Sequence, residues 1–350
     1  MAGIIFYTQA YNSEKTIART IESVLKQTYG DFTYYIFDND STDKTGYIIS
    51  DYAKKDGRII ATRKDTNNFH AYLDVVADCC HKHPNGFWAM LDADDEYKPD
   101  FLAKMLSFLH ANGLDMAACG SDVLDEKTKQ LFAQRKIDED LVMSKTGFSE
   151  NFGNYHPFMR TIWGKIYSIP LLRKCSFDKV RNVRYGADTI FTMETFKRAD
   201  RVGILKGTLH KYYTSRKSVS YRWDSTRVES IHLLDYMTRG FLREKCGEIT
   251  PLNNHILSLI HFDAIVDTLE VLLNAELAFS EKILNVKNIV SLKKVQKLFS
   301  GNYAQGRDPD KKIRNLVLNW VLSQSKSRRT EYVKTFDEIL TAIYPNPDIS

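Results

Sequence analysis

The chain has 350 residues, 43% hydrophobic and 27% charged, so it is long enough to bury a core and to form about two domains. Its net charge is only +5, no run reaches the ~18 apolar residues of a membrane span, and residues 1–6 lack the basic region of a signal peptide. We therefore expect a cytoplasmic protein. The five cysteines show no Cys-x-x-Cys spacing, which argues against a disulfide framework or zinc site and predicts free thiols.

Four short runs of β-branched and aromatic residues predict buried strands. They cover residues 4–8, 33–37, 58–62 and 87–91. Apolar residues between these runs recur at helical spacing, first after Ser13, which we interpret as a helix N-cap, and again from Ile48 to Tyr52. Strands that alternate with helices predict an α/β fold with a doubly wound, mostly parallel twisted sheet.

Polar segments follow three of the predicted strands, at residues 9–12, 38–43 and 92–96. In doubly wound sheets ligands bind outside the carboxyl ends of the strands, so we expect these segments to meet at one rim. Beyond them, Pro99 occupies a predicted first helical position, and the apolar stripe from Phe101 to Leu109 predicts a helix that packs on the core.

The pattern changes near residue 222, and we predict an α/β domain over 1–222 and a helical domain over 223–350. Apolar residues dominate after Pro251, and no glycine occurs between Gly247 and Gly301. A loop is predicted at 301–309, where glycine, aspartate and proline gather. These helices are candidates for acceptor docking or self-association.

The segment 281–334 contains 13 Lys or Arg residues and 4 Asp or Glu residues. One interpretation is peripheral contact with an anionic partner or surface. The other is that these side chains solvate helix faces. Aromatic residues are not interleaved with the charges, so we expect no nucleic acid partner.

Asp92 and Asp94 stand one residue apart after a predicted strand. Hard carboxylate oxygens suit Mg²⁺ or Mn²⁺, which neutralises a diphosphate leaving group. An ordinary acidic turn is the alternative interpretation. An EF-hand does not fit, because Tyr97 and Ala103 stand where its loop needs Gly and Glu. A P-loop and a G-x-G-x-x-G turn are both absent from the sequence.

Four motifs, in this order and spacing, resemble the inverting, bacterial type of family-2 glycosyltransferase with the GT-A fold. They are YNSEK at 11–15, SVLKQTY at 23–29, DNDSTDKT at 38–45 and LDADD at 91–95. The resemblance is strong over residues 3–110 and weaker over 160–220.

The resemblance implies a nucleotide site made of Gln9, Tyr11, Asp38, Asn39, Asp92 and Ala93. It implies metal ligands at Asp92, Asp94 and Asp95, with His210 either a further ligand or a packing residue. The sequence departs from the family at Asn39, where a second Asp is usual, and at Asp40, where Gly is usual. Residues 67–72 replace the family's Gly-rich, Arg-bearing stretch, so its contacts are not carried over.

Residues 185–191 resemble the segment that supplies the catalytic base of inverting members, which implies Asp188 in that role; Ala187 stands where Glu is usual. A plain helix N-cap is the alternative for Asp188. The stretch 213–220 resembles a lid over the diphosphate, with Arg216 and Ser218 as contacts, although Arg216 is equally compatible with an exposed loop. Trp163 and Lys165 are predicted to border the sugar or acceptor, with core packing as the alternative for Trp163.

The implied activity is metal-dependent, inverting transfer of a sugar, a hexose or GlcNAc, from a UDP-sugar to a hydroxyl group. Acceptors left open are a surface glycan, a teichoic-type polymer, a lipid-linked sugar and a protein. Three alternatives compete: a sugar-1-phosphate nucleotidyltransferase, which would need a Gly-rich N-terminal loop; a haloacid-dehalogenase phosphatase, which would need Thr or Val at Glu96; and a non-catalytic sugar-nucleotide or glycan-binding module.

Overall fold

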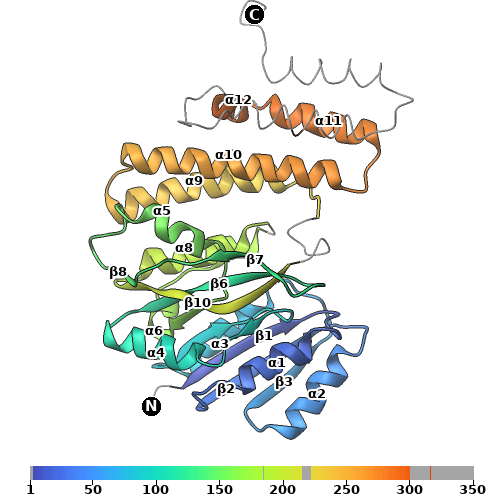
Figure 1. The fold of residues 1–350 in the computed structure, drawn as a ribbon, viewed down its shortest axis with the longest axis vertical. Coiled ribbons are helices and arrows are strands. Elements are labelled where there is room, and N and C mark those ends of the chain that lie inside the picture. Colours follow the sequence, from blue (N-terminus) through green and yellow to red (C-terminus); the bar gives the residue numbers. More distant parts are fainter. Residues whose placement is uncertain (1–2, 184, 215–221, 300–315, 317–350) are drawn as a thin grey trace, which may run out of the picture. The chain divides into compact units, whose positions relative to one another are not determined.

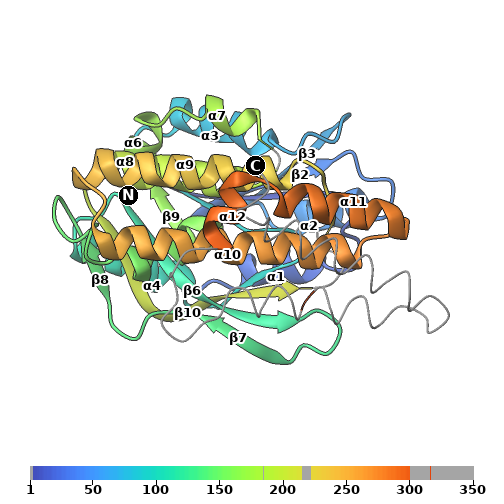
Figure 2. The ribbon, with the colours of Figure 1, turned by 90° about the horizontal axis from the view of Figure 1, so that it is seen from above.

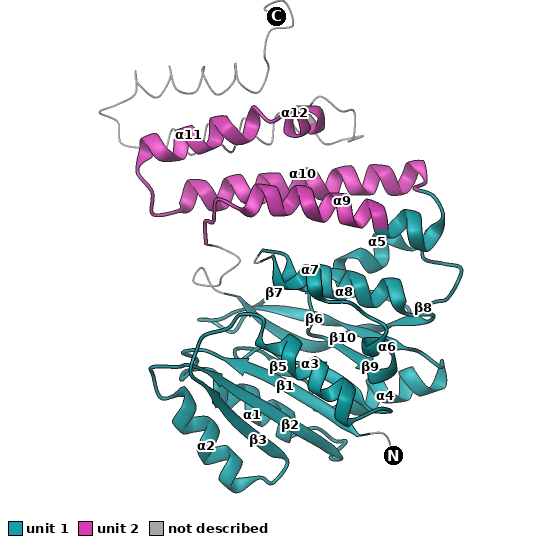
Figure 3. Cartoon of the chain, turned by 180° about the vertical axis from the view of Figure 1, so that it is seen from behind, with its two compact units in different colours: residues 1–215, 241–248 teal, residues 216–240, 249–350 magenta. Residues whose placement is uncertain are grey.

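The computed structural model describes residues 3–183, 185–214, 222–299 and 316. The chain divides into two compact units, one of residues 1–215 and 241–248 and one of residues 216–240 and 249–350 (Figure 3). The predicted lid contacts Arg216 and Ser218 lie outside the described residues, as does the predicted loop at 301–309.

The first unit contains a ten-stranded mixed sheet (Figure 1). Its order is β3 (Ile59–Lys64), β2 (Phe32–Asn39), β1 (Ile4–Ala10), β4 (Phe87–Met90), β9 (Lys165–Ser168), β6 (Met116–Asp125), β10 (Val202–Thr214) and β5 (Glu96–Tyr97). β7 (Leu131–Arg135) pairs with β6, and β8 (Leu141–Met143) pairs with β10. Strands β3, β2, β1 and β4 run parallel, and so do β6 and β10. β9 is antiparallel to both β4 and β6.

Helices cover both faces of this sheet (Figures 1 and 2). Helices α1 (Ile17–Leu25), α2 (Thr45–Lys55) and α4 (Phe101–Ala111) share one core with the side chains of Phe6 and Ala89. Helices α3 (Ala71–Lys82), α6 (Ile169–Arg173) and α8 (Ala187–Arg198) lie on the other face, where Trp88 contacts Phe191 with ring centroids 5.9 Å apart. Along the chain, the short helix α5 (Phe152–Tyr155) and the 3₁₀ helix η1 (His156–Arg160) precede α6, and the short helix α7 (Asp178–Arg181) follows it.

All four predicted strands are confirmed as β1 to β4. Burial was wrongly predicted for β3, which is an edge strand whose side chains are mostly exposed. Two predicted helix starts are wrong. Ser13 is not an N-cap, because α1 begins at Ile17 and the carbonyl of Ser13 instead accepts the backbone N–H groups of Thr16 and Ile17. Pro99 lies before α4, because the N-cap of that helix is Asp100. The carbonyl of Pro99 accepts the N–H of Thr28.

The second unit is helical over its described residues and contains α10 (Pro251–Asn274), α11 (Phe279–Val290) and α12 (Lys293–Phe299). The side chain of Thr250 caps α10 by accepting the N–H of Asn253 at 3.1 Å. No helix in the described ranges is both long enough and apolar enough to cross a bilayer. The basic segment 281–334 is described only through residue 299 and at 316.

Helix α9 (Arg227–Cys246) belongs to both units, since its residues from Phe241 onward group with the first. There Phe241 meets the ring of Tyr155 at 6.4 Å, and the Lys245 ammonium donates to the carbonyls of Lys197 and Ala199 at 3.2 and 2.5 Å. Those carbonyls end α8, so this part of α9 caps a helix of the sheet unit.

Candidate active site

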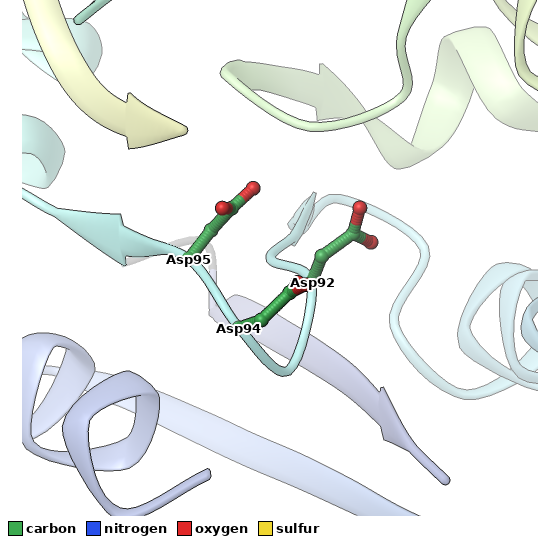
Figure 4. A group of neighbouring side chains, drawn as sticks. All are labelled: Asp92, Asp94 and Asp95. Carbon is green, nitrogen blue, oxygen red and sulfur yellow. The ribbon is translucent and has the colours of Figure 1, made fainter. Parts of the chain in front are cut away.

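Three carboxylates meet in the turn between β4 and β5. The turn is closed by the N–H of Asp95, which donates to the carbonyl of Asp92 at 3.2 Å. One ligand oxygen from each of Asp92, Asp94 and Asp95 lies within 4.8 Å of the others. Figure 4 shows the carboxylates of Asp92 and Asp95 pointing to the same side of the loop. We call residues 92–95 the metal loop.

Asp95 carries a buried oxygen that has no hydrogen-bond partner among the described residues. Its Oδ1 accepts the backbone N–H of Tyr213 at 2.9 Å, whereas Oδ2 makes no hydrogen bond. The Nε2 atom of His210 lies 3.3 Å from Oδ2 but also lacks a hydrogen bond. Because a buried oxygen without a partner is costly, Oδ2 fits a cation ligand.

The pKa of each of the three carboxylates is raised, and for Asp92 and Asp95 neighbouring aspartates contribute to the rise. Burial, then the charges of Asp94 and Asp188, raise the pKa of Asp92 well above its usual value. Burial, then Asp94 and Asp92, raise the pKa of Asp95 in the same way. Burial lowers the pKa of His210 well below its usual value, so this imidazole is neutral and offers no compensating charge. A divalent cation would supply that charge, so the donor set fits Mg²⁺ or Mn²⁺.

Asp188 lies in the first turn of α8, as its second residue. The N-cap position is held by Gly186 at φ +85°, so the interpretation of Asp188 as an N-cap is wrong. Burial raises the pKa of Asp188 to about 6, opposed by the charge of Lys165 and by the N–H of Ile162, which donates to the carboxylate. The charge of Asp188 also raises the pKa of Asp92, so the fold brings these two residues, distant in sequence, near each other.

Amide side chains gather beside the end of β1 and β2. Gln9 Nε2 donates to the carbonyl of Asn68 at 3.0 Å. Asn39 Nδ2 donates to Asn67 Oδ1 at 2.7 Å and to the same Asn68 carbonyl at 3.2 Å. The segment after β3, where the family pattern is lost, is thus tied to two predicted nucleotide residues.

Asp38 and Asp40 have different structural roles. The buried Asp38 carboxylate accepts the N–H of Ser41 at 3.0 Å and pairs with Arg63 at 3.2 Å. Much of its capacity to accept hydrogen bonds is therefore used within the protein. Asp40 has φ +67°, a left-handed conformation that glycine adopts more easily. That conformation explains why glycine is usual at this position.

The remaining predicted contacts differ in exposure. Tyr11 is 49% exposed just after β1, whereas Ala93 is buried in the metal loop. Trp163 is also buried, and its ring stacks on His210 with centroids 4.3 Å apart. Lys165 is 1% exposed, and its ammonium donates to the carbonyls of Thr161 and Trp163. Contact of Trp163 and Lys165 with sugar or acceptor stays a prediction.

Sequence reasoning did not assign a role to three residues that hold the metal loop, Arg19, Thr20 and Tyr213. The Arg19 guanidinium donates to the carbonyl of Asp94, and the Tyr213 N–H binds Asp95 as described above. No local pattern marks Arg19, because its partners come from residues 94, 96 and 126, far away in sequence. All five cysteines are free, as predicted.

The model of the family described as "Glycosyl transferase family 2" matches residues 7–180. The chain is a family-2 glycosyltransferase. Membership of this family favours a sugar transferase over the nucleotidyltransferase, phosphatase and binding-module alternatives.

Curated relatives of this glycosyltransferase match over part of its length. The "Uncharacterized glycosyltransferase EpsJ" of Bacillus subtilis is 23% identical over 212 residues, 60% of either chain. The "UDP-Glc:alpha-D-GlcNAc-diphosphoundecaprenol beta-1,3-glucosyltransferase WfaP" of Escherichia coli is 36% identical over 101 residues, 29% of this chain and 38% of WfaP. The match therefore spans less than two thirds of either relative.

A solved structure of S. aureus TarS 1–349 in complex with UDP-GlcNAc superimposes with a TM-score of 0.51 and 15% identity, covering 97% of this chain and 81% of that one. This similarity confirms the predicted GT-A fold with C-terminal helices.

Proposed function

We propose that this glycosyltransferase moves a hexose or N-acetylhexosamine from a UDP-sugar to a hydroxyl of a cell-surface glycan or its lipid-linked precursor, with inversion, in the cytoplasm. The observation that carries the proposal is the cluster of three carboxylates with an unpartnered Asp95 oxygen, electrostatically coupled to Asp188. The similarity to WfaP, which uses UDP-glucose and a lipid-linked acceptor, and to TarS, solved with UDP-GlcNAc, supports these donor and acceptor classes.

Asp92, Asp94 and Asp95 would hold Mn²⁺ or Mg²⁺, which, when bound, neutralises the charge that develops on the departing diphosphate. Asp188 acts on the acceptor: its carboxylate takes the hydroxyl proton while that oxygen attacks the anomeric carbon and UDP leaves from the opposite face. With a pKa of about 6, Asp188 is mostly ionised at neutral pH and still close enough to it for effective proton transfer. Such a base contributes roughly 10²–10⁴-fold to the rate.

Calorimetric titration with UDP and with GDP, each with Mn²⁺ or with EDTA, tests the donor site. We expect UDP to bind at least ~10-fold more weakly in EDTA, a difference of about 1.4 kcal/mol, because the diphosphate and the carboxylates repel one another without a cation. Equal affinity in EDTA would contradict the metal role, and a preference for GDP would contradict the uracil assignment.

Asp94→Asn and a matched control, Asp100→Asn, sharpen this test. Asp100 is an acidic residue at the start of α4 that pairs with Lys104 at 2.5 Å. Only Asp94→Asn should weaken Mn²⁺-dependent UDP binding. Release of UDP from UDP-glucose and UDP-GlcNAc, with and without Mn²⁺, then identifies the donor.

A further inference from the structure

The backbone of the metal loop is attached to α1 by two adjacent side chains. The guanidinium of Arg19 donates to the carbonyl of Asp94, and the hydroxyl of Thr20 donates to the carbonyl of Asp95 at 2.9 Å. Both donors come from one turn of one helix, whose apolar face is buried in the sheet core. The loop that carries the carboxylates is therefore fixed to a rigid element.

Arg19 is itself fixed on several sides. Its Nε lies 3.4 Å from Glu96 and its Nη2 lies 3.2 Å from Glu126. Its guanidinium lies over the ring of Tyr213, 3.8 Å from the centroid. A planar guanidinium stacks on a ring and donates several hydrogen bonds at the same time, so a lysine in its place would lose some of these contacts.

Tyr213 closes the network from β10. Its backbone N–H holds Asp95 Oδ1 at 2.9 Å, which leaves Oδ2 as the unpartnered oxygen. Its hydroxyl donates to Glu96 at 2.6 Å, the same carboxylate that pairs with Arg19. Lys129 covers the ring at 4.5 Å. Strand β10 and helix α1 are thus joined around the metal loop.

We propose that Arg19 and Tyr213 are positioning residues that set the affinity of the metal loop for its divalent cation, by holding Asp95 and the Asp94 backbone in place. This inference rests on the proposed function, since it concerns the same cation. The three carboxylates repel one another, so a loop without these anchors would relax apart and would have to be reassembled at each binding event. Partners outside the ligand set typically contribute 10–100-fold to metal affinity.

The test measures Mn²⁺ binding by the loss of the free-ion electron paramagnetic resonance signal, with UDP present. We expect Arg19→Met to weaken Mn²⁺ binding 10–100-fold, and Arg19→Lys to weaken it less because the charge is kept. In a transfer assay, the Mn²⁺ concentration for half-maximal rate should rise, while kcat at saturating Mn²⁺ stays near that of wild type. A loss of kcat that excess Mn²⁺ does not restore would contradict a positioning role.

Arg58→Met is the matched control. Arg58 also lies over an aromatic ring, that of Phe32 at 4.6 Å, and pairs with Asp56 at 2.7 Å, but it does not touch the metal loop. We expect the two variants to lose similar melting temperature and only Arg19→Met to lose Mn²⁺ affinity. Should Arg19→Met not fold, Arg19→Lys and Tyr213→Leu decide, because leucine removes both the ring under Arg19 and the hydroxyl bond to Glu96. Wild-type Mn²⁺ affinity in both overturns the inference. Failure of wild type to bind Mn²⁺ would instead overturn the proposed function.

Discussion

At the scale of single residues, what surrounds each buried carboxylate separates structural acids from functional ones. Asp38 is buried beside an arginine and a backbone N–H, and its charge is matched within the protein. Asp188 and Asp95 are held in surroundings that raise their pKa. A raised pKa in a cluster of like charges costs folding energy, so such a cluster points to a ligand or a reaction.

Asp188→Asn separates catalysis from donor binding. The amide keeps the shape but cannot accept the acceptor proton, so transfer should fall at least ~100-fold while Mn²⁺-dependent UDP affinity stays unchanged. Calorimetry and a transfer assay on wild type, Asp188→Asn and Asp100→Asn provide the comparison. Transfer within about threefold of wild type would mean that another carboxylate is the base.

The pH profile gives a second view of the same residue. A base must be ionised, and the pKa of Asp188 is about 6, so kcat/KM should fall as the pH drops through about 6. The effect on stability has the opposite sign: the folded state binds this proton more tightly than the unfolded chain, so this group's contribution falls as pH rises from about 4 to 6. A rate that is flat from pH 7 to pH 5 would exclude Asp188 as the rate-determining base.

The residues that could be predicted are those whose neighbours lie close in sequence or follow a family pattern. Asp92, Asp94 and Asp95 fall in one turn, so spacing alone gathers them. Arg19 and Tyr213 could not be found this way. Arg19 binds a backbone carbonyl, and Tyr213 acts partly through its own N–H, so neither role depends on a recognisable pair of side chains.

At the scale of elements, strands β1, β2 and β4 were predictable because their apolar runs are continuous, whereas helix starts were not. Ser13 has the side chain of an N-cap, but its N–H donates to the hydroxyl of Thr45 at 2.7 Å, a contact with a different loop. Such a contact depends on the assembled sheet, which local patterns do not encode. β9 was also missed: its four residues pair antiparallel between β4 and β6, and no alternation marks them.

Gly203 sets how closely β10 approaches α4. A Cβ there would lie 2.3 Å from Leu114 Cδ1 and 2.5 Å from Phe108 Cε1, both in a packed core. We therefore expect Gly203→Ala to destabilise the protein by about 1–3 kcal/mol in urea unfolding.

Gly240→Ala is the contrasting control for that measurement. Gly240 lies within α9, and a Cβ there meets nothing within 4 Å. Alanine should raise stability by up to about 1 kcal/mol, because glycine is a poor helix former. If both substitutions shift the unfolding midpoint in the same direction, close packing is not the reason that residue 203 is a glycine.

At the scale of the whole molecule, the helical unit contains a histidine pair, of which His261 is buried and His232 half-buried, that should make it acid-sensitive. His232 Nδ1 and His261 Nε2 are 2.9 Å apart. Burial lowers the pKa of His232 and lowers that of His261 to about 4, against the opposing charge of Asp235. Both rings are neutral when folded, whereas the unfolded chain takes up protons below its usual pKa of about 6.5.

Stability should therefore be lost as pH falls from about 6.5 to 4. Thermal unfolding at pH 7.5, 6 and 5 measures this, and His261→Gln should show a smaller loss than wild type because one titrating ring is gone. His81→Gln, at an exposed position of α3, should retain the full wild-type loss. An equal pH dependence in His261→Gln and His81→Gln would assign the acid sensitivity elsewhere.

The proposed boundary at residue 222 and the role of 223–350 in docking an acceptor or a second copy stay predictions. Removal of everything after residue 222 also removes 241–248, which caps the helix that carries Asp188. Loss of transfer in that truncation would thus mix loss of docking with damage to the catalytic helix. A deletion that retains 241–248 is the cleaner comparison.

The two-part membership of α9 bears on how such an enzyme can change over generations. The chain leaves the sheet unit, returns to it at Phe241 and leaves again after Glu248, so three junctions separate the two units along the gene. A single recombination event within 216–240 would join a sheet unit to residues 241–248 of a different protein, although these residues pack on the sheet unit. Replacing the helical unit by one of different specificity therefore requires recombination at several junctions at once, or gradual substitution within the existing unit. The two units should tend to be inherited together.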